Sequence, residues 1–354
     1  MPLLVNNQTG QAGGSAIRED LADYIAIADA KSCPFVSQAP KGRELGNMRF
    51  DWQVDSYGAP TLGGVVDGAD VTVASAANPV ADRTRLSNFA QAFRRSFRVG
   101  FIAETQDVAG VQSEIANGIA KSLLLLKRDM EATFSLTTVG TSAGGQVAQL
   151  DNGSNAYLTS SLGNWITNAA SSTVGQAPSA YAPASAAKST VTTANFVEGS
   201  VQDVLTSIYG QTGVFRDYDC ILGTTLKRAF TNLTASKTTE VVNTNTIAAT
   251  AVRTFNQDLS DSTFTSSIDI FSGDFGTVRL SPSTFIGYNN GGTWTATPYK
   301  GYVLPMDMVE IRYAKLPEVV DLPNAGGGQA RLVQAIAGLV VKNPLGLGMF
   351  TPAS

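Results

Sequence analysis

The chain contains no histidine among its 354 residues. Histidine is the side chain that most often carries protons near neutral pH, and its imidazole is a frequent metal ligand. Its absence excludes Ser-His-Asp and Cys-His catalysis. The motif Gly140-Thr141-Ser142-Ala143-Gly144 matches the pattern of a nucleophile elbow, but it lies in a Gly/Ser/Ala-rich stretch and has no histidine base. The sequence therefore predicts a protein that is not an enzyme and that uses no cofactor or metal.

Charge is also scarce. Charged residues make up 15% of the chain, whereas ordinary soluble domains carry about 25%. The net charge is -4 and lysines do not cluster, so the row of cations that binds nucleic acid through its phosphates is missing. Two interpretations of the low charge stay open at this point: much of the surface faces neighbouring subunits, or the protein is rich in β-structure with neutral loops.

Cysteines and long apolar runs are few as well. Cys33 and Cys220 are the two cysteines, which is too few for a disulfide framework and fits a reducing compartment. The residues after Met1 lack the basic and apolar regions of a signal peptide. No stretch approaches an uncharged apolar run of about 20 residues, so a membrane span is not expected. We expect a soluble protein made in a cytoplasm.

The most informative feature that is present is an aromatic strand followed by a long amphipathic helix. The strand places Phe89, Phe93, Phe97, Val99 and Phe101 on one face. Apolar residues then recur at steps of three or four, namely Val108, Val111, Ile115, Ile119, Leu123, Leu126, Met130 and Phe134. This spacing predicts a helix from Gln106 to Phe134, about 43 Å long. Because its charges exclude a membrane span and it lacks sustained heptads, we interpret it as an architectural spine.

A long hairpin precedes this helix. Alternating polar and apolar residues predict strands at Asn47–Tyr57 and Arg85–Phe101, joined by the Gly/Ala/Pro-rich loop Gly58–Thr84. A loop of roughly 25 residues is far longer than common connections and is typically functional. Since the hairpin cannot bury both faces itself, it needs another molecule or domain to lie against. The candidate contact residues are Phe50, Trp52, Arg83, Arg85, Phe93, Arg94, Arg95 and Arg98. The alternative is an ordinary solvated sheet face.

Composition indicates how the regions flanking the spine are organised. Met1–Ala16 is polar and Gly-rich and predicts a mobile arm. Arg18–Ala28 predicts a short helix with Leu21, Tyr24, Ile25 and Ala28 on one side, and an extended stretch begins at Pro34. After the spine, Thr137–Thr193 is rich in small neutral residues. Within it we expect Leu162, Trp165 and Ile166 to form one docked anchor, and Gln176–Lys188 to be an exposed insertion.

The remaining sequence predicts a second, mixed domain. Asn195 with Glu198 three positions on is an N-cap signature, and a second helix is expected at Thr224–Leu233. Short strands are expected at Tyr218–Leu222, Val252–Gln257, Ser266–Ser272, Thr277–Ser281 and Val309–Tyr313, with a hairpin turn at Gly273–Gly276. Pro317–Gly328 is interpreted as a connection and Ala330–Lys342 as a long strand that returns beside the spine. Helices on a small mixed sheet predict an α+β fold.

This order of elements resembles the major capsid proteins of tailed bacteriophages, which have the Hong Kong 97-type capsid fold. Four stretches are also locally similar to one branch of that family: Asp20–Phe35 to its arm, Phe50–Ser56 to its extended-loop strand, Leu125–Glu131 to the end of its spine helix, and Phe271–Val278 to a hairpin of its axial domain. The resemblance implies an N-terminal arm (1–46), an extended loop hairpin (47–101), a peripheral domain with the spine (102–194), an axial α+β domain (195–316), and a return to the peripheral domain with a C-terminal tail (317–354).

The resemblance also implies a function. Copies of the chain are expected to form pentamers and hexamers that close into an icosahedral shell around double-stranded DNA, without sequence-specific DNA contacts. Expected partners are a portal protein and, optionally, a separate scaffolding protein and decoration proteins. The shell is expected in the virion, after assembly in the cytoplasm of a bacterial host. The alternative is an encapsulin-like bacterial shell protein of the same fold that holds protein cargo. A fibre or adhesin repeat protein is disfavoured because no internal period of 20–50 residues is present.

Overall fold

The computed structural model describes most of the chain outside its N-terminal 28 residues. The described residues are 29, 31–57, 60, 62–64, 66–70, 83–106, 113–137, 145–167, 174–191, 196–233, 239–242, 245–248, 268–290, 293–324 and 326–352. The predicted arm Met1–Ala16, the helix Arg18–Ala28, the strand Val252–Gln257 and the Ser142 motif lie outside them. Within the described part, no helix is long and apolar enough to cross a membrane.

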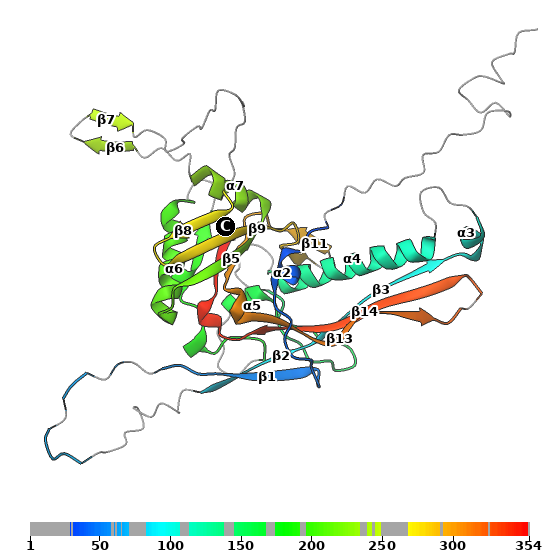
Figure 1. The fold of residues 1–354 in the computed structure, drawn as a ribbon, viewed down its shortest axis with the longest axis horizontal. Helices are drawn as coiled ribbons and strands as arrows, with labels where there is room; N and C mark the ends of the chain where they lie inside the picture. Colours follow the sequence, from blue (N-terminus) through cyan, green and yellow to red (C-terminus); the bar gives the residue numbers. More distant parts are fainter. Residues whose placement is uncertain are drawn as a thin grey trace, which may run out of the picture.

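Three structural parts are visible in Figure 1. A long helix, α4, lies along a three-stranded sheet of order β13-β14-β3. A six-stranded sheet of order β4-β15-β12-β5-β9-β8 forms the bulk of the body together with α6 and α7. The two-stranded hairpin β1–β2 runs along the base and projects away from the body at its loop end.

The spine helix is shorter than its apolar periodicity predicts. Helix α4 spans Glu114–Phe134, 21 residues. Ser113 is its N-cap, with extended backbone angles and a side chain that accepts from the Ala116 amide. The predicted start at Gln106 is therefore wrong, since α4 begins only after its capping serine, which lies seven residues further along the chain. A separate short helix, α3 (Phe101–Thr105), precedes it, so Phe101 is not part of the strand and is 63% exposed.

The buried face of α4 also differs from the predicted stripe. Leu126, Met130 and Phe134 are at most 2% exposed, whereas Leu123 is 38% exposed. The first half of the helix therefore lies over the sheet with its apolar side partly open. Gly118 lies where the helix crosses the Phe97 ring, and a Cβ at that position would come 2.4 Å from a ring carbon. This glycine lets helix and strand approach closely.

The sheet beneath the spine confirms the predicted returning strand. Strand β14 (Gln329–Val341) pairs antiparallel with β3 (Gln91–Val99). Its other neighbour, β13, spans Val309–Leu322. The predicted Pro317–Gly328 connection is wrong in its first half, because β13 continues through Pro317 with register shifts between Tyr313 and Glu318. Bulges of this kind accommodate a proline on an edge strand, where its missing N–H costs no ladder bond.

The predicted hairpin is present with a break in its second arm. Strand β1 (Arg49–Val54) pairs antiparallel with β2 (Thr84–Phe89), in register from Arg49↔Phe89 to Val54↔Thr84. Ala90 separates β2 from β3. The two halves of the predicted Arg85–Phe101 strand therefore belong to different sheets, and the chain passes from the projecting hairpin into the sheet under the spine.

The described part of the low-charge segment after the spine, residues 145–167 and 174–191, is called the insertion from here on, and much of it is built into the interior. Helix α5 (Leu162–Thr167) carries Leu162, Trp165 and Ile166, all at most 1% exposed, which confirms the predicted anchor. The prediction that Gln176–Lys188 is an exposed insertion is wrong, because Tyr181 is 2% exposed and both Ala177 and Ala187 are 0% exposed. The small side chains let this segment lie close to its neighbours. It contains the 3-10 turns η2 (Ser179–Tyr181) and η3 (Ser185–Ala187) and ends in β4 (Lys188–Val191).

The six-stranded sheet collects strands from distant parts of the sequence. Its strands, besides β4, are β5 (Arg216–Leu222), β8 (Ile270–Gly273), β9 (Gly276–Pro282), β12 (Gly301–Leu304) and β15 (Gly348–Pro352). Strand β15 pairs with both β12 and β4, so the C-terminal strand lies within this sheet. The hairpin turn at Gly273–Gly276 is confirmed.

Two helices accompany this sheet. Helix α7 (Thr224–Leu233) has the predicted bounds. Helix α6 (Glu198–Thr212) begins later than predicted, with Val197 at its N-cap position and no side-chain cap. The predicted N-cap, Asn195, lies outside the described residues. The remaining elements are α2 (Pro34–Gln38), β6 (Thr239–Val242), β7 (Asn245–Ala248), β10 (Gly287–Asn290), β11 (Thr293–Ala296), η4 (Met306–Met308) and η5 (Pro344–Gly346). The helix α2 replaces the extended stretch predicted from Pro34, since proline is well tolerated in the first turn of a helix.

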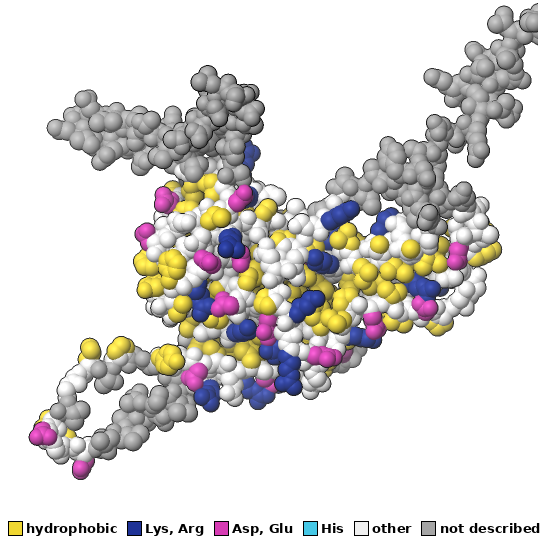
Figure 2. All heavy atoms as spheres, in the orientation of Figure 1, with side chains coloured by type: hydrophobic (Ala, Val, Ile, Leu, Met, Phe, Trp, Pro, Cys, Tyr) yellow, Lys and Arg dark blue, Asp and Glu magenta, His cyan; other side chains and the backbone are white. Residues whose placement is uncertain are grey.

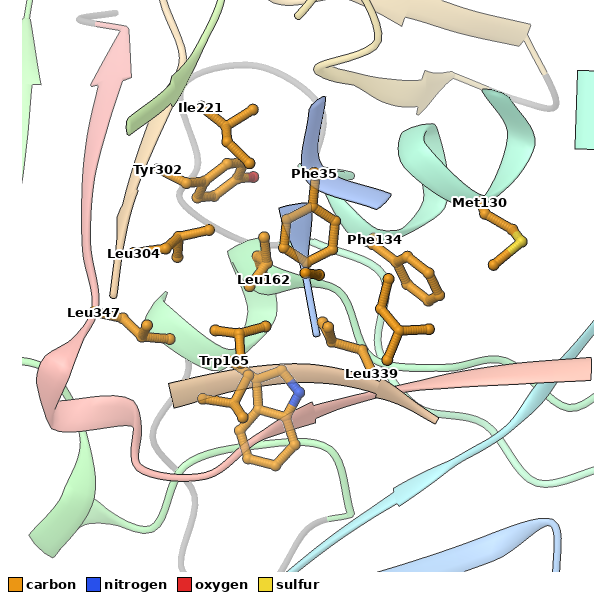
Figure 3. Close-up of a cluster of buried hydrophobic side chains, with 14 of the residues drawn as sticks. Phe35, Met130, Phe134, Leu162, Trp165, Ile221, Tyr302, Leu304, Leu339 and Leu347 are labelled. Atoms are coloured by element: carbon orange, nitrogen blue, oxygen red, sulfur yellow. The ribbon is translucent and has the colours of Figure 1, made fainter. Parts of the chain in front are cut away.

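The main core lies where the spine, the insertion and both larger sheets meet. Figure 3 shows Phe35, Phe134, Trp165, Tyr302 and Leu339 converging there from five different elements or connections. A second cluster lies between the six-stranded sheet and helices α6 and α7. The main core joins the second half of the spine and the hairpin to the body, and it therefore holds the exposed faces of both elements in a defined position.

Candidate assembly surfaces

The base of the hairpin is anchored by aromatic residues. The rings of Trp52 and Trp165 lie 5.5 Å apart, and the Trp52 indole Nε1 donates to the Val341 carbonyl at 2.9 Å. Phe50 stacks on Trp52 and is 7% exposed. Phe50 and Trp52, both predicted contact residues, therefore pack within the chain and hold the hairpin against β14 and the insertion.

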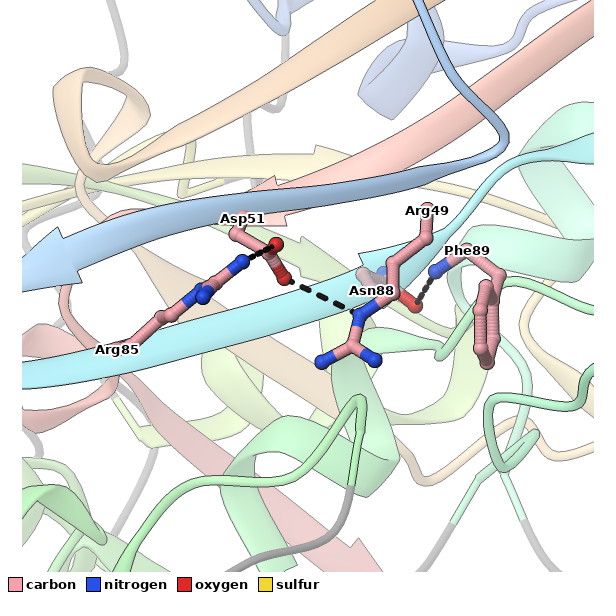
Figure 4. A network of polar contacts seen from close by, with 5 residues as sticks. All are labelled: Arg49, Asp51, Arg85, Asn88 and Phe89. Atoms are coloured by element: carbon pink, nitrogen blue, oxygen red, sulfur yellow. Dashed lines mark hydrogen bonds and ion pairs between the residues drawn. The ribbon is translucent and has the colours of Figure 1, made fainter.

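Ion pairs follow the exposed face of the same hairpin. Figure 4 shows Arg49 and Arg85 converging on the Asp51 carboxylate. Arg85 lies diagonally across the ladder from Asp51, since Asp51 pairs with Ser87, and such diagonal neighbours are within reach of long side chains. Arg83 pairs with Asp55 at 3.2 Å nearer the loop. Exposed pairs of this kind contribute about 0–1 kcal/mol each, so they favour one hairpin geometry without dominating its stability.

The loop end of the hairpin exposes large apolar side chains. Tyr57 is 104% exposed, Leu62 94% and Val66 78%. They lie on the segment that projects from the lower edge of the body in Figures 1 and 2. Exposed apolar residues gathered on one projection mark an interaction site more often than a free surface. The described part of the chain offers these three side chains no cover.

Strand β3 presents different residues on its two faces. Phe93 is 5% exposed and packs edge-on against Phe134, with ring centroids 6.1 Å apart. Arg95 forms a bidentate ion pair with Asp129 of the spine, both contacts at 2.6 Å, and this hydrogen bond raises the Arg95 pKa. Arg94 and Arg98 are exposed and form no ion pair with any described residue. Of the arginines predicted to be contact residues, Arg94 and Arg98 are the two whose charge is not paired with a described carboxylate.

A buried carboxylate joins the spine to two other segments. Glu131, 0% exposed, accepts from the amides of Phe35 and Val36 at 3.1 and 2.8 Å and from the Ser283 hydroxyl at 3.3 Å. Burial raises its pKa, and these hydrogen bonds, with the nearby Lys127, oppose the rise. The sequence analysis used Glu131 only as one of the charges that exclude a membrane span and gave it no structural role. An acidic residue four positions after Lys127 looks like a surface helix pair, so no local signal distinguished it.

A second network missed by sequence reasoning fastens the insertion to the hairpin. The Asn88 side chain donates to the Leu339 carbonyl at 2.7 Å and accepts from the amides of Phe89 and Ser160 at 2.9 Å (Figure 4 shows the Phe89 bond). Thr159 bridges Asn88 to the Leu339 amide. These residues are fully buried, so the Ser/Thr/Asn content of the insertion supplies neutral hydrogen-bonding groups inside the protein, where charges would be costly.

Among the residues that the structure describes, Lys300 is buried without an acidic partner. Lys300 is 1% exposed, and its Nζ lies 3.4 Å from the Thr351 hydroxyl and 6.0 Å from the centre of the Tyr302 ring. Burial lowers its pKa to about 8. It lies immediately before β12 and contacts β15, inside the six-stranded sheet. The site is enclosed by protein and offers no access to a substrate.

Within the described ranges, no group of three acidic, cysteine or histidine side chains is placed to hold a metal ion. Cys33 and Cys220 are both buried free thiols, and burial raises the pKa of each. A raised pKa keeps a thiol protonated and unreactive. The exposed features of the described chain that remain as candidates are the loop end of the hairpin and the arginines of β3.

The fold defines the class of protein. A helix lying along a three-stranded sheet, a projecting hairpin and a separate mixed sheet form the Hong Kong 97-type capsid fold. The capsid structure of the cyanophage P-SCSP1u is similar with 12% identity and a TM-score of 0.56, covering 99% of this chain and 97% of that chain. A structure from Mycobacterium phage Bobi has 13% identity and a TM-score of 0.52, with 98% of both chains covered. The α+β capsid fold predicted from the sequence is confirmed.

The sequence also matches the SU10 major capsid protein family over residues 5–354, and the chain belongs to that family. It is a structural major capsid protein of a tailed bacteriophage, located in the capsid of the virion, and it builds the shell from copies of itself. The encapsulin from Synechococcus elongatus shares the fold at 9% identity and a TM-score of 0.51, covering 99% of this chain and 96% of that chain. The family match favours the viral shell over the cellular one. Comparison with curated proteins found no match.

Proposed function

We propose that the projecting hairpin makes the contacts that close the shell. In this proposal, copies of the chain group as pentamers and hexamers, and these close into an icosahedral container for double-stranded DNA. Each copy extends its loop (residues 58–84) onto a neighbouring copy. The observation that carries the proposal is the exposure of Tyr57, Leu62 and Val66 on a segment that points away from its own body.

The predicted contact residues divide into two roles in this proposal. Phe50, Trp52 and Phe93 act indirectly, because their burial holds the hairpin and β3 at a defined angle to the body. Arg83, Arg85, Arg94 and Arg98 lie on exposed faces and act directly. Arg95 acts indirectly, because its ion pair with Asp129 holds β3 to the spine. Arg94 and Arg98 are proposed to meet carboxylates of the neighbouring copy, since their charges are unmatched among the described residues.

We propose that the chain divides into the parts that the resemblance implies. The arm (1–46) and loop (47–101) bind neighbours, the peripheral parts (102–194 and 317–354) carry the spine, and the axial part (195–316) lies nearest the symmetry axes. The last strand, β15, contributes to the sheet of the axial part. DNA is proposed to be held without sequence-specific contacts, which fits a net charge of -4. A portal protein and assembly in the host cytoplasm complete the proposal, with scaffolding and decoration proteins as optional additions.

Deletion of the loop tests this function. We expect a chain that lacks Gly58–Thr84, with the strands joined by a short Gly/Ser turn, to yield a folded soluble subunit that forms no closed shells. The hairpin base survives because its contacts lie within the protomer. Circular dichroism, size-exclusion chromatography and negative-stain electron microscopy measure the two properties separately. Closed particles of normal appearance from the deleted chain contradict the role given to the loop.

A matched pair of variants separates the loop contact from general surface effects. Tyr57→Ser with Leu62→Ser removes apolar surface from the loop, and Val147→Ser with Leu150→Ser removes it from the insertion, where these residues are 45% and 55% exposed. Only the loop variant is expected to lose shells. The ratio of absorbance at 260 and 280 nm in particles produced by the phage tests the second part of the proposal, because nucleic acid inside distinguishes a viral shell from one filled with protein.

A further inference from the structure

An apolar groove lies open beside the second half of the spine. It has a volume of about 420 Å³ and lies between α2, α4 and β13. Leu126 and Met130 are at most 2% exposed and form its inner side, whereas Leu123 is 38% exposed. The rest of its lining is Val36, Ser37, Lys41, Lys127, Tyr313 and Pro317. Because binding pockets typically measure about 300–1,000 Å³, the groove has room for apolar side chains of another segment.

Two lysines give this groove a positive charge. Lys41 is exposed, and Lys127 donates to the Ser37 hydroxyl at 2.8 Å. Among the described residues, neither ammonium group forms an ion pair with a carboxylate. An occupant that complements the groove therefore has apolar side chains for its inner side and carboxylates for the lysines.

The loop end of the hairpin carries the opposite charge. The Ala69 amide donates to the Val66 carbonyl at 3.1 Å and closes a turn, in which Gly68 has a φ of 80°. A positive φ at the third residue of a turn favours glycine. Asp67 lies in this turn, Asp70 follows it, and both are exposed. Figure 2 shows acidic and hydrophobic side chains together at the far end of this projection. The loop end therefore combines negative charge with apolar surface.

We propose that the loop end of one copy occupies the groove of a second copy. The proposal rests on the proposed function, in which the loop reaches a neighbouring copy, and it names the surface that the loop meets there. Leu62 and Val66, which are 94% and 78% exposed, enter the groove. Asp67 and Asp70 then lie against the lysines at its edge. Opposite charges across the contact determine how the loop is oriented on its neighbour.

The arrangement of the two surfaces within one copy supports an occupant from another copy. Figure 1 shows the hairpin loop and α4 extending to opposite sides of the body, so the loop end points away from the groove of its own chain. Each copy thus carries both surfaces at different places. A contact between two different surfaces passes from copy to copy and closes into a ring when the rotation allows. This agrees with a chain that builds a shell from copies of itself.

Disulfide cross-linking in assembled particles tests the pairing of loop end and groove. After mild oxidation, Leu62→Cys combined with Leu123→Cys is expected to give a ladder of dimers and higher multimers on a non-reducing gel. Leu62→Cys with Leu125→Cys is the matched control, since Leu125 is 37% exposed on the same helix but does not line the groove. The native cysteines are buried and need no removal. No ladder, an equal ladder in the control, or a disulfide within one monomer overturns the proposal.

Charge reversal tests the same contact without new cysteines. Asp67→Lys with Asp70→Lys is expected to lower the yield of closed shells and to leave the melting temperature of the subunit unchanged. Addition of Lys41→Glu should restore part of the yield, whereas Lys121→Glu, an equal charge change on the exposed face of α4 outside the groove, should not. Equal yields from these two combinations overturn the proposal. If shells then still require residues 58–84, the loop keeps its proposed function and only the groove is rejected as its partner.

Discussion

At the residue scale, two buried ionisable groups affect stability in opposite directions as pH changes. Glu131 accepts hydrogen bonds from α2 and from the connection after β9, so it ties three segments together. Lys300 lies in the six-stranded sheet with one hydroxyl as its polar contact. Burying a charge is costly unless hydrogen bonds compensate for the lost water. Glu131 accepts three hydrogen bonds, whereas Lys300 makes one, so more of the cost of burial is offset at Glu131.

The raised pKa of Glu131 makes its contribution pH-dependent. Because the folded state holds the proton more tightly than the unfolded state, the stabilisation is fully present below the unfolded pKa of about 4.3 and is lost as pH rises through the folded pKa. Glu131→Gln removes this titration. We expect the melting temperature of wild type to rise relative to that of Glu131→Gln as pH is lowered from 7 to 5. A difference that stays constant over this range contradicts the raised pKa.

Replacement of Lys300 is expected to stabilise the subunit. Its pKa is lowered from 10.5 to about 8 by burial, and 2.5 pKa units correspond to about 3 kcal/mol at 1.36 kcal/mol per unit. A lowered pKa means that the stability of wild type rises with pH between 8 and 10.5. At pH 7, Lys300→Met should therefore unfold at a higher urea concentration than wild type, and its free energy of unfolding should be larger by up to about 3 kcal/mol. This difference in free energy should narrow at pH 10.

The exposed Lys121 provides the control for that measurement. Lys121→Met changes the same side chain on the surface of α4 and should leave the free energy of unfolding within about 0.5 kcal/mol of wild type. A Lys300→Met variant that is less stable than wild type at pH 7 would show that the contacts of the ammonium with Thr351 and the Tyr302 ring outweigh its desolvation.

At the scale of elements, the spine helix changes its role along its length. Its second half carries Leu126, Met130 and Phe134 into the main core, and its first half lies over β3 with Ile119 half-buried. A helix of this kind gains most of its stability from the packed end. The same change along the helix leaves Leu123 38% exposed.

Charges placed at the two ends of the spine should therefore have different effects. Met130→Asp puts a carboxylate into the core and is expected to prevent folding, since an unpaired buried charge costs far more than the net stability of a domain can absorb. Ile119→Asp should lower stability by about 1–3 kcal/mol and leave a folded subunit. Far-ultraviolet circular dichroism with urea unfolding distinguishes the two. An unfolded Ile119→Asp chain would mean that the first half of the helix is as deeply packed as the second.

At the scale of the whole molecule, the low charge has two structural explanations. Part of it is the insertion, where Asn88, Thr159 and Ser160 form a buried neutral network. Part of it is apolar surface left uncovered by the protomer, along α4 and at the hairpin loop (Figure 2). The second explanation agrees with a shell protein, because interface cores are depleted in charge.

Two adjacent arginines separate assembly from stability. Arg94 is exposed and forms no ion pair with described residues, whereas Arg95 is held by Asp129. Arg94→Ala is expected to lower the yield of closed shells and to leave the melting temperature of the subunit unchanged. Arg95→Ala should destabilise the subunit by about 0–1 kcal/mol, the usual value of an exposed pair. Thermal denaturation and negative-stain microscopy measure the two effects, and shells of wild-type yield from Arg94→Ala would remove it from the interface.

Local patterns predicted many elements and few contacts. Helix α7, the β1–β2 hairpin and the anchor Leu162–Ile166 follow from periodicity and turn residues, because these report on neighbours within a few positions. The start of α4 was missed because apolar spacing continues past the true N-cap, Ser113. The predicted contact residues included aromatic residues that pack within the chain and arginines that form no ion pair with described residues. A strand pattern shows that residues share a face, but it does not show what covers that face.

The sequence by itself determined helix α7, the β1–β2 hairpin, the α+β class and the absence of histidine chemistry, since each depends on residue type and short-range spacing. Only the tertiary structure decided which polar groups are buried. Glu131 is a surface charge by its spacing and a core carboxylate by its position, because α2 and Ser283 reach it from 95 to 152 residues away in the chain. Burial is a property of neighbours brought together by folding, and no local pattern records it.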